Sequence, residues 1–109
     1  SVSRGDPAFA EQDYWRGRIW APLNFLVYLA MEGREALADV RHDLAEKSRM
    51  LFLKEWNEKR HIHENYSTVT GEGCDKENSD AFYHWGALLA AIWLMECRET
   101  GGLFAVPEA

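Results

Sequence analysis

The pattern of apolar and polar residues predicts three helices, of which the first runs from Pro22 to about Met31. This segment is apolar on nearly every side of a helix; Pro22 suits its first turn and Gly33 suits its C-terminal cap. A helix that is apolar all round is expected to be buried all round. We therefore expect other helices to cover it on every side.

Residues 35–58 carry the most regular amphipathic pattern and predict a second, longer helix. One stripe along it consists of Leu37, Val40, Leu44, Lys47 and Leu51. Charged residues, among them Arg41 and Glu55, occupy the remaining face. The pattern predicts a surface helix that turns this stripe toward the core. The short link at residues 32–34 makes the first two helices an antiparallel hairpin.

Residues 61–80 show no periodicity and predict a loop of about twenty residues, a length at which loops are usually functional or disordered. A third helix is expected to begin near Ser79 or Asp80, either of which could cap it, and to run to about Arg98. Residues 101–107 are expected to end it with a Gly-Gly pair and to continue as a short extended tail.

These elements predict a single all-α domain, because 109 residues leave room for one small domain. Two nearly all-apolar helices and one amphipathic helix do not cover one another in a three-helix bundle. The chain is therefore expected either to self-associate or to belong to a larger helical body. Alternating buried and half-exposed helices are what a double-ring helical barrel requires.

The chain is acidic, with 12 Lys and Arg against 18 Asp and Glu and a formal net charge of −6. This balance argues against general nucleic-acid binding and against a polybasic membrane anchor. The first ten residues lack the apolar stretch of a signal peptide, and no apolar run is long enough to cross a bilayer. We expect a cytoplasmic protein with no nucleic-acid or membrane partner, in which Cys74 and Cys97 are free thiols.

The loop contains a candidate for proton transfer and a candidate for metal binding. Glu64 could act as an acid or a base, although a charged loop residue is more often simply solvated or caps a neighbour. His61 and His63 could share one face of an extended segment, but no third ligand is evident from the spacing. Solvated or hydrogen-bonded histidines are the simpler interpretation, and we expect no metal and no other cofactor.

Aromatic residues gather before the first helix and again at the start of the third. Three rings and a guanidinium lie within seven residues: Tyr14, Trp15, Arg16 and Trp20. Aromatic faces stack on sugar rings, and Arg donates to hydroxyls or carboxylates. Packing at the helix entry explains the same residues without a ligand. Trp85 allows the same two interpretations, and Gly86 beside it permits close approach of another backbone.

Four segments follow one another along most of the chain. They are Tyr-Trp-Arg-Gly-x-Ile-Trp-x-Pro-x-Asn-x-Leu-Val-Tyr from residue 14, His-Glu-Asn-Tyr from 63, Thr-Gly-Glu-Gly from 70 and Phe-Tyr-His-Trp-Gly-Ala-Leu-Leu from 82. Their order and spacing resemble glycoside hydrolase family 63, which includes processing α-glucosidases and bacterial hydrolases of α-glucosides and of mannosyl- or glucosylglycerate. The resemblance runs from about Asp13 to Met95.

The resemblance implies a fold for the whole chain. Residues 1–109 would form the C-terminal portion of the family's catalytic (α/α)6 barrel. In that fold helical hairpins form a double ring, which would be incomplete in this chain or completed by oligomerisation.

The resemblance also implies roles for particular residues. Glu64 matches the general base, which activates the water that attacks the anomeric carbon with inversion. The residues matched to substrate binding are Tyr14, Trp15, Arg16, Trp20, Asn65, Tyr66 and Trp85. Asn65 and Tyr66 would in addition position the loop that carries the base. His63 and Glu72 match only as candidates for the rim of the sugar pocket.

The sequence departs from the family at Arg18, where many members have Pro, and at Ser67, where many have Asn or Asp. The family's general acid is an aspartate on an upstream segment rich in Trp, Asp and Ser, and neither Asp6 nor Asp13 has that context. Inversion requires this second carboxyl about 6.5–9.5 Å from the base. We therefore expect the isolated chain to be inactive, with the acid supplied by the rest of the barrel or by a partner chain.

Two other functions stay open on the sequence alone, a non-catalytic sugar-binding module and a helical oligomerisation module. Packing does not require a carboxylate at Glu64, which favours part of an inverting α-glycosidase acting on an α-glucoside or related glycoside. In each case the uncovered apolar helices are expected to make the isolated chain self-associate.

Overall fold

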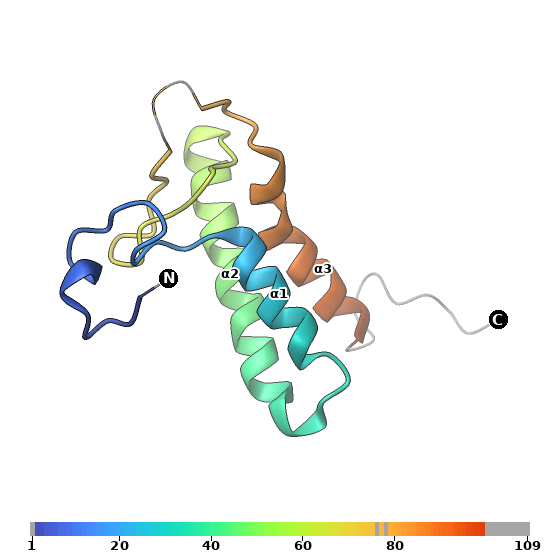
Figure 1. Ribbon diagram of the computed structural model, residues 1–109. Coiled ribbons are helices and arrows are strands. Elements are labelled where there is room, and N and C mark those ends of the chain that lie inside the picture. Colours follow the sequence, from blue (N-terminus) through green and yellow to red (C-terminus); the bar gives the residue numbers. More distant parts are fainter. Residues whose placement is uncertain (1, 76, 78, 100–109) are drawn as a thin grey trace.

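The computed structural model describes residues 2–75, 77 and 79–99, and within them the chain is built from three α-helices (Figure 1). They are α1 (Ala21–Met31), α2 (Ala38–Lys59) and α3 (Leu88–Glu99). The described residues contain isolated β-bridges but no strand. The all-α prediction is therefore confirmed, and three packed helices are consistent with a helical portion of an (α/α)6 barrel. Residues 101–107, expected to end the third helix and form a tail, lie outside the described residues.

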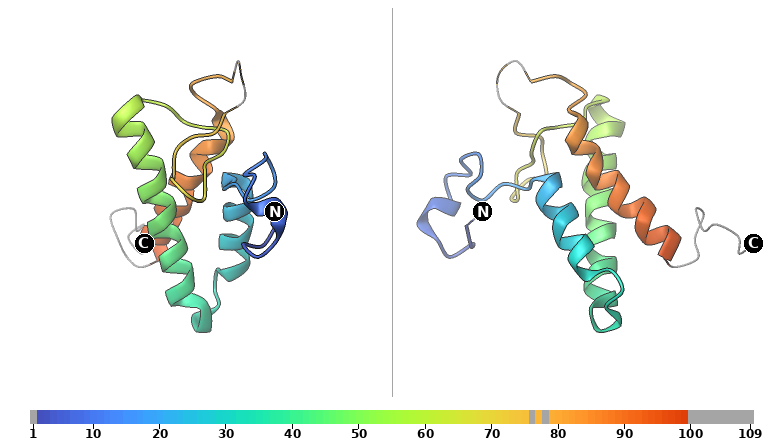
Figure 2. Two further views of the ribbon diagram at one scale, coloured as in Figure 1. Left: turned by 90° about the vertical axis from the view of Figure 1, so that its left-hand side faces the viewer. Right: turned by 45° about the vertical axis from the view of Figure 1, so that its right-hand side comes forward.

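The helices pack side by side, and each contacts the other two (Figures 1 and 2). α1 and α2 run antiparallel, and α3 returns along α2, so the expected hairpin is present. Pro22 lies in the first turn of α1, and Gly33 follows that helix with a φ of +68°, the left-handed conformation that suits a C-terminal cap. Both terminal signals in the sequence therefore act as predicted.

The buried face of α2 differs from the predicted stripe. Val40 is 58% exposed, and Leu37 lies in a short 3₁₀ turn, Glu35–Leu37, that precedes the helix. The buried residues of α2 are Arg41, Ala45, Ser48 and Glu55. Two of these are charged and were assigned to the surface. They are buried because each has oppositely charged partners inside the chain, which offset the cost of removing them from water.

α1 is not covered on every side by the described chain. Its buried residues are Ala21, Tyr28 and Met31, whereas Leu26 is 61% exposed and Val27 is 54% exposed. The expectation of all-round burial is therefore wrong for this chain taken alone. The uncovered apolar side is the one that a larger helical body would have to bury.

α3 begins later than predicted, at Leu88, and a 3₁₀ turn over His84–Ala87 precedes it. Asp80 does not cap a helix, since its carboxylate accepts the N–H of Phe82 in a local turn. The backbone on either side of Phe82 is instead paired with Ile62, whose N–H donates to Ala81 and whose carbonyl accepts the N–H of Tyr83. This pairing keeps the segment extended where the sequence suggested a helix.

Two apolar clusters form the core. The first joins Ala21, Tyr66 and Leu89, and the second joins Tyr28, Ala45 and Ile92. Each cluster draws on more than one element, so the loop after α2 is packed into the helices through Tyr66.

A buried polar group adjoins the second cluster. The Glu96 carboxylate on α3 accepts a hydrogen bond of 2.9 Å from Tyr28 on α1 and an ion-paired hydrogen bond of 2.8 Å from Arg41 on α2. These contacts join all three helices.

Cys74 and Cys97 do not form a disulfide with each other. Over the part of the chain that the structure describes, no helix has both the length and the apolar character needed to cross a membrane.

Candidate functional site

The loop after α2 is fixed by backbone pairing to the segment that precedes α1. Ile19 and Tyr66 exchange two backbone hydrogen bonds of 2.8 and 2.9 Å, and the N–H of Cys74 donates to the carbonyl of Asn65 at 2.9 Å. Residues 63–66 therefore lie between the N-terminal segment on one side and residues 73–75 on the other. This pairing places Glu64 close to the aromatic residues that precede α1.

Side chains strengthen the same junction. The side-chain oxygen of Gln12 accepts a hydrogen bond of 3.2 Å from the backbone N–H of Thr68, and the Thr68 hydroxyl donates to the carbonyl of Gly17 at 2.6 Å. Arg18 donates to the side-chain carbonyl of Asn65 at 3.1 Å and to the carbonyl of Cys74 at 3.0 Å. Arg18, noted as a departure from the family pattern, is thus a link between the two segments.

Glu64 is a buried carboxylate held by hydroxyl groups. Glu64 is 5% exposed. Its Oε1 accepts a hydrogen bond of 2.6 Å from the Tyr14 hydroxyl, and its Oε2 accepts one of 3.4 Å from the Ser79 hydroxyl. Among the described residues no Lys or Arg forms an ion pair with it. Its backbone N–H donates to Asp75 at 2.6 Å. The interpretation of Glu64 as a solvated loop residue is therefore wrong.

Tyr14 adopts a left-handed backbone conformation, with a φ of +52°, which is unusual for a residue with a bulky side chain. Its hydroxyl reaches Glu64 from this position. The hydrogen bond to Glu64, together with partial burial and the negative charge of the carboxylate, raises the pKa of Tyr14. The Tyr14 hydroxyl is therefore a donor to Glu64 rather than an acid that ionises near neutral pH.

An aromatic cluster surrounds this pair. Trp15 and Trp20 are stacked with ring centroids 3.6 Å apart, and Tyr14 meets Trp20 edge-on at 4.8 Å. Trp85 meets Trp20 edge-on at 6.1 Å and meets Tyr83 at 5.4 Å. The structure thus brings together the aromatic residues that the sequence placed in two separate segments.

The candidate substrate residues differ in exposure. Trp15 is 42% exposed, and Arg16 is also exposed, with its guanidinium 2.5 Å from the Asp13 carboxylate. Three candidates, Trp20, Asn65 and Tyr66, are fully buried. The buried three pack or hold the loop, while Trp15 and Arg16 offer surfaces to a ligand.

Trp85 is partly buried, and its indole Nε1 has no hydrogen-bond partner among the described residues. The two weaker candidates for the rim of the sugar pocket also differ in exposure: His63 is buried and Glu72 is exposed.

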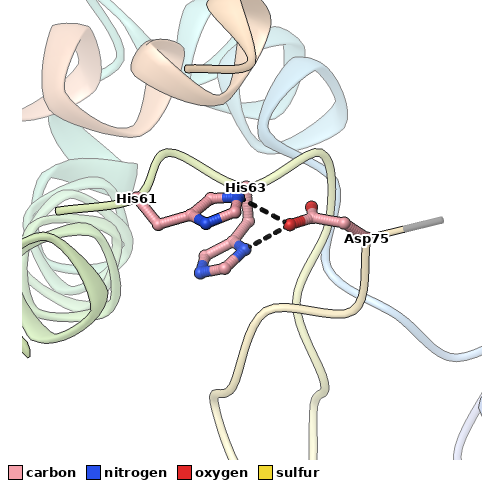
Figure 3. Close-up of side chains that lie close together, drawn as sticks. All are labelled: His61, His63 and Asp75. Carbon is pink, nitrogen blue, oxygen red and sulfur yellow. Dashed lines mark hydrogen bonds and ion pairs between the residues drawn. The ribbon is translucent and has the colours of Figure 1, made fainter. Parts of the chain in front are cut away.

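Asp75 is a site residue that the sequence analysis missed. One of its oxygens accepts the backbone N–H of Glu64 at 2.6 Å, and the other lies 2.6 Å from Nδ1 of His63 and 2.8 Å from Nε2 of His61 (Figure 3). In the sequence Asp75 is simply an acidic residue in a loop, directly after Cys74. Nothing in its neighbours distinguishes it from a solvated carboxylate. Its role depends on the fold of the loop.

His61, His63 and Asp75 supply the set of three groups that a metal ion would need, with their ligand atoms within 4.8 Å of one another. The two imidazole rings, however, are stacked 3.9 Å apart with only 9° between their planes. A ring nitrogen directs its lone pair in the plane of its ring, so two parallel stacked rings do not both point at one ion. Only His63 is hydrogen-bonded to the Asp75 carboxylate, whereas Nε2 of His61 lies near the same oxygen without a hydrogen bond among the described residues.

Glu55, on the last turns of α2, is the second site residue that the sequence missed. Its side chain is fully buried, 3.0 Å from Lys59, 3.3 Å from Nε2 of His63 and 3.2 Å from the N–H of Gly73. Burial alone would raise the pKa of Glu55, but the hydrogen bonds from Lys59 and Gly73, the Lys59 charge and His63 lower it to about 2. Glu55 is thus a fixed negative charge behind the loop.

Two glycines allow the loop to pack this closely. A Cβ on Gly73 would overlap with the His63 ring, and a Cβ on Gly86 would overlap with the His63 carbonyl oxygen. Both positions therefore require glycine, which has no Cβ. The close backbone approach expected at Gly86 is confirmed.

The chain is similar in sequence to known glycoside hydrolases. Residues 1–85 match the model of a family described as the mannosylglycerate hydrolase MGH1-like glycoside hydrolase domain. The chain is also 31% identical, over 105 residues, to the mannosyl-oligosaccharide glucosidase of Saccharomyces cerevisiae (strain ATCC 204508 / S288c). That match covers 84% of this chain and 12% of the yeast protein, so the chain spans a small part of its relative. No solved structure matches the chain significantly.

The family match covers the aromatic segment before α1, the loop with Glu64 and the segment before α3 as far as Trp85. These are the segments that converge in the site. The chain therefore belongs to the MGH1-like glycoside hydrolase domains, in keeping with its resemblance to glycoside hydrolase family 63.

Proposed function

We propose that this chain supplies the general base, Glu64, and part of the sugar pocket to an inverting α-glycosidase. The substrate class is an α-glucoside or a related glycoside. The general acid comes from outside this chain, either from the rest of a catalytic barrel or from a partner chain.

The observation that carries the proposal is the contrast between Glu64 and the two other carboxylates that are buried in the described part of the chain, Glu55 and Glu96. Glu55 is paired with Lys59, and Glu96 is paired with Arg41. Such pairing is how structural carboxylates are normally accommodated inside proteins. Glu64 is equally enclosed, but its side-chain partners are hydroxyls. Packing does not require a carboxylate that is buried without a Lys or Arg partner among the described residues. Such a carboxylate suits a group whose charge is used in a reaction.

The two oxygens of Glu64 suit different tasks. Oε1 is occupied by the short hydrogen bond from Tyr14, which fixes the plane of the carboxylate. Among the described residues Oε2 has only the long contact with Ser79, so it is the oxygen that can accept a proton from a water molecule. In an inverting mechanism this water attacks the anomeric carbon while the acid protonates the leaving oxygen on the other side of the sugar.

The aromatic cluster offers the surface against which a sugar ring can stack. Trp15 is exposed and is backed by Trp20, which lies parallel to it and is itself held by Tyr14. Because Glu64 lies within the same cluster, a ring stacked on Trp15 is near the base.

The uncovered apolar side of α1 supports completion by other helices. Leu26 and Val27 are more than half exposed in this chain, on a helix that has Tyr28 fully buried on its other side. The match to 12% of a longer relative accords with this. We propose that the neighbouring helices of the barrel cover this side and bring the general acid.

The test is hydrolysis of 4-nitrophenyl α-glucoside by the polypeptide that carries this sequence in its source, compared with its Glu64→Gln variant. Loss of the base is expected to lower kcat by a factor of at least about 100. Glu77→Gln, an exposed glutamate on the same loop, is the matched control and is expected to keep full activity. Full activity in Glu64→Gln would contradict the assignment, and so would strong turnover by the isolated 109-residue chain.

A non-catalytic sugar-binding module is the second candidate, and the exposed Trp15 face favours it. In that case saturable sugar binding would be lost in Trp15→Ala and kept in Glu64→Gln, and the native polypeptide would show no turnover. Isothermal titration with glucose and maltose distinguishes the two candidates.

A further inference from the structure

We propose that Asp75 is the positioning residue of the base, and that His63 and Glu55 hold Asp75 in place. The inference rests on the proposed function of Glu64 and adds a role for three residues behind it. Asp75 contacts the backbone N–H of Glu64, and His63 and Glu55 act on Glu64 through Asp75.

Asp75 fixes the main chain at Glu64. Its Oδ1 accepts the N–H of Glu64 at 2.6 Å, a short, charge-assisted hydrogen bond. The side chain of Glu64 leaves the backbone at the same residue, so a shift of this N–H moves the carboxylate with it. Displacement of a catalytic group by about 1 Å can lower the rate about 100-fold.

His63 fixes the other oxygen of Asp75. Its Nδ1 lies 2.6 Å from Asp75 Oδ2, and its Nε2 lies 3.3 Å from Glu55 Oε2. The ring is 5% exposed and is enclosed by Gly73, whose missing side chain leaves the space that the ring fills. His63 is therefore tightly enclosed and contacts the Asp75 carboxylate from this position (Figure 3).

Glu55 anchors the series to the helices. It lies on α2 and takes hydrogen bonds from the Lys59 ammonium, the His63 ring and the N–H of Gly73. The series from α2 through Glu55, His63 and Asp75 to Glu64 is continuous at hydrogen-bond distances. It transmits the rigidity of a 22-residue helix to a loop that has no regular structure of its own.

The series is more than the packing of a loop needs. The loop is already held by the backbone pairing of Tyr66 with Ile19 and by the contacts of Gln12 with Thr68. Burying two carboxylates and an imidazole costs free energy, and apolar residues would fill the same space at lower cost. A requirement that the Glu64 carboxylate be placed accurately accounts for this arrangement.

The experiment uses the native polypeptide with 4-nitrophenyl α-glucoside. Asp75→Ala is expected to lower kcat about 100-fold with KM changed less than about threefold, because the sugar surface stays intact. Asp75→Asn retains an acceptor for the N–H of Glu64 and is expected to recover part of the loss. Glu77→Gln is the exposed control on the same loop.

Azide separates positioning from loss of structure. It attacks the anomeric carbon of the α-glucoside without a base, the leaving oxygen takes its proton from the general acid, and the product is the β-glycosyl azide. Azide is therefore expected to restore turnover in Glu64→Ala, and to the same extent in the double variant Glu64→Ala/Asp75→Ala, because a positioning residue has no further effect once the base is gone. If azide restores Glu64→Ala but not the double variant, the positioning role is wrong.

A second measurement needs no activity. In the 109-residue chain, the backbone amide of Glu64 is expected to be protected from hydrogen exchange and to lose that protection in Asp75→Ala, while the amide of Tyr66 stays protected. An unprotected Glu64 amide in the parent chain would overturn the inference.

The outcomes also distinguish the two proposals. Full activity of Glu64→Gln removes the proposed function. An inactive Glu64→Gln beside a fully active Asp75→Ala leaves the function and removes the positioning role. Activity that falls with EDTA and returns with Zn²⁺ would instead assign His61, His63 and Asp75 to an ion.

Discussion

The hydroxyl of Tyr14 donates a hydrogen bond of 2.6 Å to the carboxylate of Glu64, which lies 50 residues further along the chain. The contact joins the aromatic segment before α1 to the loop after α2. It also leaves Oε2 as the less engaged oxygen of the proposed base.

Tyr14→Phe removes this hydrogen bond and keeps the ring. We expect the free energy of unfolding to fall by about 1 kcal/mol, because a buried carboxylate loses a donor. The loss should be smaller in a Glu64→Gln background, where the acceptor is neutral. Urea unfolding of the four proteins measures the coupling, and Tyr83→Phe is the matched control. Equal losses in both backgrounds would contradict the contact.

Gly73→Ala is expected to destabilise the chain by about 2 kcal/mol or more, because the new methyl group overlaps with the His63 ring. Gly86→Ala should have a similar effect through the His63 carbonyl. At Gly5 a Cβ meets nothing within 4 Å, so Gly5→Ala should change the midpoint of urea unfolding very little. A midpoint for Gly73→Ala equal to that of Gly5→Ala would show that His63 does not pack on Gly73.

Acid is expected to destabilise the chain through Glu55. Its folded-state pKa of about 2 lies below the ordinary value of 4.5, so the unfolded chain binds a proton in this range that the folded chain does not. The contribution is fully present above about pH 5 and is lost as the pH falls from 4.5 toward 2. The linkage amounts to about 3 kcal/mol at most.

Urea unfolding between pH 6 and pH 3 measures this effect. Glu55→Gln should flatten the acid limb of the stability curve, whereas Glu58→Gln, an exposed residue on the same helix, should leave it unchanged. An unaltered acid limb in Glu55→Gln would mean that Glu55 is not the group responsible.

The isolated chain is expected to self-associate through the uncovered side of α1. Replacing Leu26 and Val27 by Lys and Ser should shift sedimentation-velocity profiles toward monomer at every concentration. Val69→Ser changes an apolar residue that is 73% exposed on the loop and should have no effect. A monomeric parent chain with a sharp, reversible melt at low concentration would contradict the prediction.

The sequence was sufficient to predict the helices of the hairpin, the end signals of α1 and the grouping of Glu64 with aromatic residues. Pro22 and Gly33 act locally, and the recurring segments around Trp15, Glu64 and Trp85 identify the family. These features depend on neighbouring residues or on whole motifs, which a sequence displays directly.

The buried charges could not be predicted in the same way. Arg41 and Glu55 read as surface residues of α2 because their partners, Glu96 and His63, lie on other elements. Asp75 likewise gains its role only when the loop folds back to meet residue 64. A periodic pattern counts such residues as polar, whereas burial is decided by pairing in three dimensions.

The stereochemistry of hydrolysis tests the central claim most directly. Proton NMR during the first minutes of α-glucoside hydrolysis by the native polypeptide identifies which anomer of the released sugar forms first. A Glu64 base that activates water for direct attack predicts the β-anomer, with the α-anomer appearing only by later mutarotation. Initial release of the α-anomer, or release of β-anomer at an unchanged rate in Glu64→Gln, would contradict the account.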